Sequence, residues 1–205
     1  SDGAGAGNGY YLGRSCGGQV LGNAFDMYEQ DEVTSISFHV NDQSVAGAEV
    51  AVVLYEIDAT VTPYAPIYLT QSDDYTITQA DVGQWVTVSF SDPYDVYSNT
   101  TYVAAVMGYP NPVDTSLISS SSNDNTLSFI QDNGCDIGSG GFGYWYSASK
   151  PLLIRLNLGY EVASSLDEDV FDGKLSVHPN PSKGIFNIDL IDVKNGNYLI
   201  SVSNI

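Results

Sequence analysis

The chain has few cations. Its 205 residues contain 6 Lys and Arg against 25 Asp and Glu, a formal net charge of -19 at pH 7. The phosphates of a nucleic acid would be repelled by such a surface, so the composition excludes nucleic acid as a partner. High net charge most often serves solubility, and cation binding is the alternative that it leaves open.

Long apolar segments are also absent. No stretch approaches about 18 consecutive apolar residues, so the sequence predicts no membrane-spanning helix. No long apolar pattern has a period of 3.6 residues either, which limits helix to a turn or two. One such turn is expected at Thr78 to Asp81, where Thr78 can cap and Asp81 follows in the first turn. Ser, Thr, Asn, Gly and Tyr are abundant instead, as is typical of an extracellular β protein.

Only two cysteines occur, Cys16 and Cys135. In an exported protein they would form a disulfide that closes a long loop, whereas in a reducing compartment they would be separate buried thiols. We predict the disulfide.

Groups for catalysis are scarce. The two histidines are His39, expected on the solvent face of a strand, and His178, which lies in the C-terminal segment. Neither has the surroundings of a Ser-His-Asp site, and the chain has no phosphate-binding loop and no zinc-type spacing of Cys or His. A glycosidase would need two facing carboxyls, for which Glu49 and Glu56 are the least loop-like candidates, although solvation of strand ends explains both. The sequence therefore predicts no enzyme.

Short segments of strand-forming residues recur along the chain, with turn formers between nearly all of them. We expect strands at Val33 to Val40, Glu49 to Ile57, Ile67 to Gln71, Tyr75 to Thr78, Trp85 to Phe90, Thr101 to Met107, Thr126 to Ile130, Phe142 to Tyr146 and Leu152 to Leu158. This pattern predicts an all-β, jelly-roll-like β-sandwich over residues 10–160, after a Gly-rich terminus or linker at residues 1–9.

Some strands carry more specific predictions. The segments 50–55 and 102–107 are apolar on both faces and should be central strands, whereas 35–40 alternates as on an outer face. In the last strand Leu152, Ile154, Leu156 and Leu158 should point inward and Arg155 outward.

Acidic loops offer a weak case for calcium, which prefers carboxylate and carbonyl oxygens. The candidate ligands are Asp132, Asn133 and Asp136, and similar loops occur at Asp73-Asp74, at Asp92 with Asp95 and at residues 123–125. None matches the twelve-residue calcium loop, and turn chemistry explains these residues without a metal.

Aromatic residues are concentrated at Tyr144, Trp145 and Tyr146, after Phe142. Flat rings of this kind can stack on sugars, so the three side chains are a candidate platform for a surface glycan. The alternative is that Phe142, Tyr144 and Tyr146 line one face of a strand and Trp145 the other, closing the core. Tyr10, Tyr11, Tyr94 and Tyr97 are further candidates for exposed rings.

The end of the chain has a different pattern. After an acidic stretch at residues 161–173, expected to be a linker, come Val177, Pro179-Asn180-Pro181, Gly184 and an alternating strand that begins with Ile185 and Phe186. These residues resemble the start of the C-terminal sorting domain with which Bacteroidetes export proteins by type IX secretion. The resemblance covers residues 174–205, which are too few for a complete domain of that kind.

The resemblance implies the first strands of a second, Ig-like β-sandwich and two partners, the outer-membrane translocon and the sortase. It also implies a secreted or cell-surface protein. The expected function is a non-enzymatic module for binding, adhesion or surface structure, and the alternative is a carbohydrate-binding accessory module of a larger secreted hydrolase.

Overall fold

The computed structural model describes residues 8–57, 66–110, 116–122, 127–135, 137–138 and 140–159, and the backbone of 5–6, 174–178 and 187–191. The chain divides into two compact units, Ser1–Tyr160 and Glu161–Ile205. The described part contains strands and no helix, and its strands pair antiparallel. The predicted all-β class is confirmed.

The described strands follow one another along the chain with short connections. They are β1 Gly5–Ala6, β2 Gly9–Tyr11, β3 Gly13–Arg14, β4 Gly17–Gly18, β5 Val20–Met27, β6 Asp31–His39, β7 Glu49–Ile57, β8 Pro66–Gln71, β9 Tyr75–Thr76, β10 Trp85–Val96, β11 Thr100–Gly108, β12 Leu117–Ser119, β13 Ser128–Gln131, β14 Trp145–Ala148, β15 Ile154–Leu158, β16 Lys174–His178 and β17 Asn187–Ile191.

The first unit is built on one large and one small sheet. The large sheet has the order β14-β13-β5-β11-β7-β8, with β9 also paired to β7, and the small sheet has the order β10-β6-β15. The two strands predicted to be central are β7 and β11, which are neighbours in the large sheet. A third, smaller sheet of β1, β2 and β12 meets the end of the small sheet through a bridge between Val40 and Ile118.

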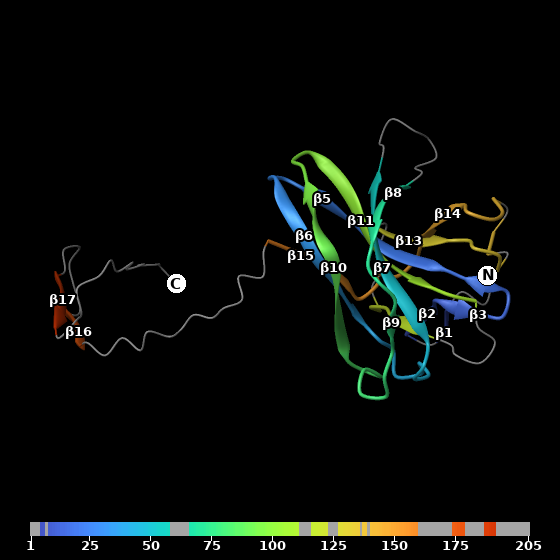
Figure 1. Cartoon of the computed structure of the whole chain (residues 1–205), viewed down its shortest axis with the longest axis horizontal. Coiled ribbons are helices and arrows are strands. Elements are labelled where there is room, and N and C mark those ends of the chain that lie inside the picture. The colour runs from blue at the N-terminus through green and yellow to red at the C-terminus, as the bar shows by residue number, and fades with distance from the viewer. Residues whose placement is uncertain are drawn as a thin grey trace. The chain divides into compact units, whose positions relative to one another are not determined.

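The two sheets pack face to face (Figure 1). Their alternating side chains meet in one apolar core, in which Ile36 and Phe38 of β6 lie with Val52 and Leu54 of β7 and with Ala104 of β11. Burial of apolar side chains from two facing sheets is what stabilises a β-sandwich. The predicted sandwich is therefore confirmed, while its jelly-roll connectivity stays a prediction.

The outer face of the large sheet carries a second apolar cluster. Val53 and Ala105 are fully buried there although no further sheet covers them in the described part. The rings of Tyr55 and Trp145 cover this face, meeting edge to face with centroids 5.1 Å apart. Burial, together with the neighbouring Tyr68, raises the pKa of Tyr55 to about 12.

Two local predictions were wrong. Residues 78–81 form a hydrogen-bonded turn and no helix, because the Asp81 carboxylate accepts both the backbone N–H and the hydroxyl of Thr78, each at 2.7 Å. Leu158, expected to point inward, is exposed, since the pairing of β15 with β6 shifts register between Asn157 and Leu158.

In the second unit the described residues form an antiparallel hairpin of β16 and β17, in which Val177 pairs with Ile188. The other residues of the sorting motif lie outside the described residues, namely Pro179, Asn180, Pro181, Gly184, Ile185 and Phe186. Among the residues that the structure describes, no helix has the length and apolar character needed to cross a membrane.

Candidate functional site

The outer face of the small sheet presents three side chains that together form the candidate site. We call His39 of β6, Trp85 of β10 and Arg155 of β15 the Trp85 cluster. Strand alternation places them there, because Phe38, Val86 and Ile154 point into the core and their neighbours must point outward. Since β6 lies between β10 and β15, the cluster spans all three strands.

The geometry of the cluster is that of a cation on an aromatic ring. The guanidinium carbon of Arg155 lies 3.9 Å from the centroid of the Trp85 ring. His39 meets the same ring edge to face, with centroids 5.7 Å apart and planes at 86°. Cation–π contacts of this kind hold a guanidinium in a fixed orientation while its N–H groups stay free to donate. Trp85 remains 39% exposed, so the cluster is open to solvent.

Hydrogen bonds between the strands hold the surface beside the cluster. Asn157 donates from Nδ2 to the hydroxyl oxygens of Ser37 at 2.8 Å and Ser35 at 3.0 Å. The Ser37 hydroxyl also lies 2.7 Å from that of Thr87. Side chains joined in this way lose little further freedom when a ligand binds, so the surface is preorganised.

His39 has a second polar contact that the sequence could not reveal. Its Nδ1 lies 3.0 Å from the hydroxyl of Ser119, a residue of β12 that is 80 positions away in the chain. Asn41 donates to the same hydroxyl at 3.2 Å. A serine beside a histidine is the start of a nucleophilic site, but Ser119 is only 7% exposed. The contact therefore orients His39, leaving its Nε2 edge for other partners.

Arg155 has no carboxylate within 4 Å in the described part of the chain, although the protein carries 25 acidic residues and only 6 basic ones. An exposed guanidinium in so acidic a chain would gain Coulomb energy from an acidic neighbour. The structure places Trp85 beside it instead. The charge of Arg155 is thus available to a ligand.

The predicted glycan platform is divided between two faces. Trp145 lies on the outer cluster of the large sheet, whereas Tyr146 packs against the core and Tyr144 tilts against it with centroids 4.9 Å apart. The expected strand from Phe142 to Tyr146 starts only at Trp145, because Gly141 and Gly143 adopt left-handed φ values of 79° and 81°. Phe142 is 80% exposed in that turn. The three rings therefore form no single flat platform.

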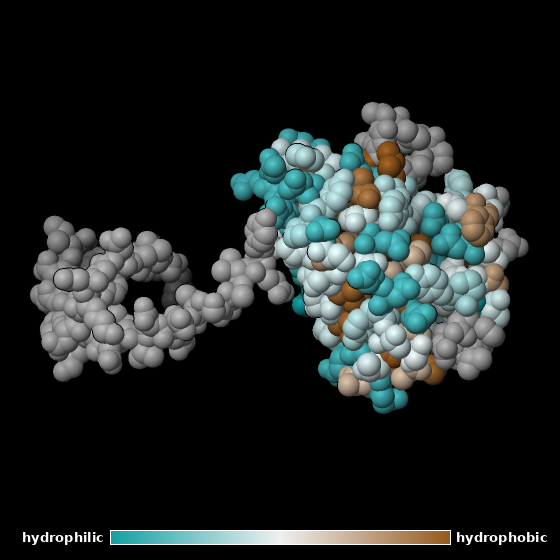
Figure 2. Space-filling view, in the orientation of Figure 1, coloured by the Kyte–Doolittle hydropathy of each residue, from teal (hydrophilic) through white to brown (hydrophobic). Residues whose placement is uncertain are grey.

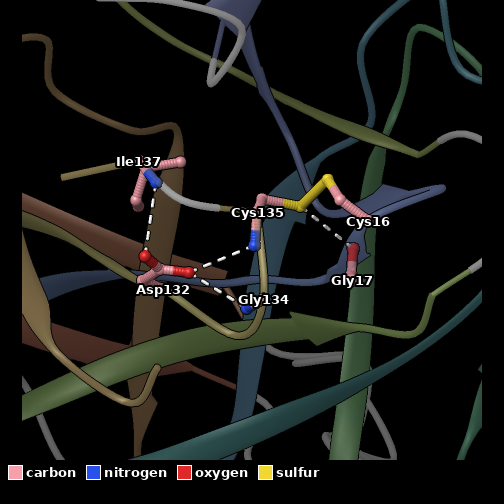
Figure 3. The surroundings of a disulfide bond; sticks show 6 residues. All are labelled: Cys16, Gly17, Asp132, Gly134, Cys135 and Ile137. Atoms are coloured by element: carbon pink, nitrogen blue, oxygen red, sulfur yellow. Dashed lines mark hydrogen bonds between the residues drawn. A yellow bond between two sulfur atoms is a disulfide. The ribbon is translucent and has the colours of Figure 1, made fainter. Parts of the chain in front are cut away.

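The predicted disulfide between Cys16 and Cys135 is present, with Cα atoms 4.9 Å apart (Figure 3). Beside it the buried carboxylate of Asp132 accepts backbone N–H groups from Gly134 at 3.0 Å, Cys135 at 3.1 Å and Ile137 at 3.2 Å. These donors point at both carboxylate oxygens, as Figure 3 shows. Asp132 therefore stabilises the loop that carries Cys135.

The residues predicted for calcium are only partly described. Asp132 is engaged by backbone donors, Asn133 follows it in the same loop, and Asp136 lies outside the described residues. Among the residues that are described, no three His, Cys, Asp or Glu side chains are grouped so that they could hold a metal ion. Calcium binding stays a prediction.

The two glutamates considered for glycoside hydrolysis are far apart. Glu49 begins β7 and Glu56 lies seven positions later in the same strand, where residues advance by about 3.4 Å each. Their separation of roughly 24 Å along the strand exceeds the 5 to 10 Å that paired carboxyls require. This pair is excluded as a catalytic dyad.

The fold and the cluster together define an acidic, disulfide-linked β-sandwich with an exposed aromatic and cationic surface. Comparison with known proteins adds no family to this description, since no protein-family model matches the chain and no curated protein is significantly similar to it.

Proposed function

We propose that this chain is an exported, non-enzymatic β-sandwich module that acts in binding, adhesion or surface structure at the cell surface or after secretion. The observation that carries the proposal is the Cys16–Cys135 disulfide, since disulfides persist in oxidising environments outside the cytosol. The excess of Asp and Glu over Lys and Arg is compatible with a protein that must stay soluble there.

The C-terminal unit supplies the proposed route of export. Its hairpin of β16 and β17 belongs to a compact unit separate from the sandwich, and it carries Val177 of the motif that resembles a type IX sorting domain. A separate unit can be recognised by the translocon and the sortase without disturbing the sandwich. The resemblance of residues 174–205 to the Bacteroidetes sorting domain is what supports this assignment.

The export route is tested with a reporter protein fused to the complete C-terminal domain in a host that has type IX secretion. We expect the reporter in the medium or on the cell surface, and none there when Pro179 and Pro181 are both replaced by Ala. A fusion to residues 10–160 alone is the control and should stay inside the cell. Retention of the reporter that carries the complete domain would refute the sorting assignment.

A second candidate is a carbohydrate-binding accessory module of a larger secreted hydrolase. The Trp85 cluster favours it, because an exposed tryptophan beside fixed hydroxyl and amide groups suits the apolar faces and hydroxyls of sugars. In this candidate the sandwich binds the substrate and an upstream domain cleaves it.

A further inference from the structure

We propose that the Trp85 cluster binds the carboxylate of an acidic sugar, a single uronic acid carried on an otherwise neutral glycan. The proposal rests on the binding role assigned above and names the ligand class for that role. In it Arg155 is the anion-binding group, Trp85 holds the guanidinium in place, and His39 borders the same pocket-free surface.

Charge complementarity selects an anion. Arg155 is one of only 6 basic residues, and in the described part no carboxylate lies within 4 Å of it. A planar guanidinium pairs with a carboxylate through two parallel N–H···O bonds, which fixes orientation as well as adding affinity. An acidic chain that leaves this group unpaired on its surface has the complement of an anionic ligand.

The surrounding groups select a sugar. Trp85 keeps 39% of its surface exposed, and the hydroxyl of Thr87 and the amide of Asn157 lie on the same face of the sheet. A pyranose presents apolar C–H faces together with hydroxyls, which match a ring edge and fixed polar groups. The hydrophobic residues visible on the sandwich in Figure 2 are scattered among hydrophilic ones, which does not suit an apolar protein partner.

The overall charge limits how many carboxylates the ligand can carry. With a net charge of -19 the protein repels polyanions, so a nucleic acid or a continuous polyuronate would be disfavoured at long range. One carboxylate on a neutral backbone contributes the local contact with Arg155 and little repulsion. We therefore expect selection for an isolated uronic acid.

The test is a calorimetric or NMR titration of the full oxidised chain with a xylo-oligosaccharide that carries one glucuronic acid branch. Two further probes are the same compound as its methyl ester and the unbranched xylo-oligosaccharide. Arg155→Gln removes the proposed contact. Arg14→Gln is the matched control, because Arg14 also lies over a ring, 5.8 Å from the centroid of Tyr11, and its loss changes the net charge equally.

We expect the free acid to bind at least roughly tenfold more tightly than the ester, as is typical for a charge-assisted contact. Arg155→Gln should remove that preference and Arg14→Gln should keep it. Arg155→Lys should restore only part, since an ammonium lacks the planar fork. Each variant's melting temperature shows that it is folded.

Three results would overturn the proposal. Equal binding of acid and ester would exclude carboxylate recognition, yet would still support a binding module for neutral sugars. Equal loss in Arg155→Gln and Arg14→Gln would show a general effect of charge. Equal binding of an acetylated peptide with one Asp would mean that the sugar is not recognised. Export of the reporter is measured separately, so failure here is distinguishable from failure of the proposed function.

Discussion

Single residues show two ways in which an acidic β protein accommodates polar groups away from water. The buried carboxylate of Asp132 is held by three backbone N–H groups of its own loop. The hydroxyl of Tyr55 stands on an apolar sheet face, where burial and the nearby Tyr68 favour the neutral phenol. Both environments depend on neighbours that sequence patterning cannot place, and Tyr55 yields a test.

Tyr55 is expected to make the sandwich less stable at high pH. Its pKa is raised from 10.0 to about 12 in the folded protein, so the unfolded chain loses this proton first as pH rises. The contribution is fully present below pH 10 and is lost between pH 10 and about 12, at no more than about 1.4 kcal/mol per pH unit. Urea unfolding at a series of pH values measures this slope.

Tyr55→Phe removes the titrating group, keeps the ring, and should flatten the slope above pH 10. Tyr109→Phe is the comparison, because the pKa of Tyr109 is also raised to about 12, mainly through its hydrogen bond to Asp74. That hydroxyl lies at the surface, so its removal should change the slope less. An unchanged slope in Tyr55→Phe would contradict the assignment.

At the scale of elements, β5 is the strand that sequence reasoning missed. It lies between β11 and β13 in the large sheet, yet Gly22, Asn23 and Asp26 interrupt its apolar pattern. Tertiary packing explains these residues. Asn23 donates to the carbonyl of Leu152 at 2.8 Å, and Gly22 lies where a side chain would meet its neighbours.

Gly22→Ala should destabilise the sandwich by about 1 to 3 kcal/mol, as overpacking of a filled site does. A Cβ at position 22 would come within 2.6 Å of Val103 Cγ1 and 3.0 Å of Ala105 Cβ. Chemical denaturation measures the loss. Ser147→Ala, on the exposed part of the neighbouring β14, is the control and should change stability by less than about 0.5 kcal/mol. Equal stability of the glycine variant would show that β5 can move away.

At the scale of the whole molecule, the disulfide ties the N-terminal segment to the loop after β13. Cys16 and Cys135 are 119 residues apart in sequence, so their bond restricts most of the unfolded sandwich. The described strands between them include both strands of every close pair at the centre of the large sheet. Reduction should therefore affect the stability of the whole unit.

Loss of the disulfide is expected to lower the free energy of unfolding by about 4 to 5 kcal/mol if the chain-entropy model holds, because the closed loop is long. Urea unfolding with and without a reductant measures the difference. The Cys16→Ser/Cys135→Ser double variant should match the reduced wild type and should not respond to reductant. A smaller difference would indicate that the reduced unfolded chain retains structure.

The sequence by itself determined the strand class, the two central strands, the disulfide pair and the outward direction of Arg155, because alternation with period two acts locally along each strand. Only the tertiary structure decided that β5 is a strand, that Leu158 is exposed, and that Tyr144, Trp145 and Tyr146 do not share a face. It alone assembled His39, Trp85 and Arg155 from three strands far apart in the chain. Sheet order and register bring such residues together, and they depend on packing between strands, which no local pattern encodes.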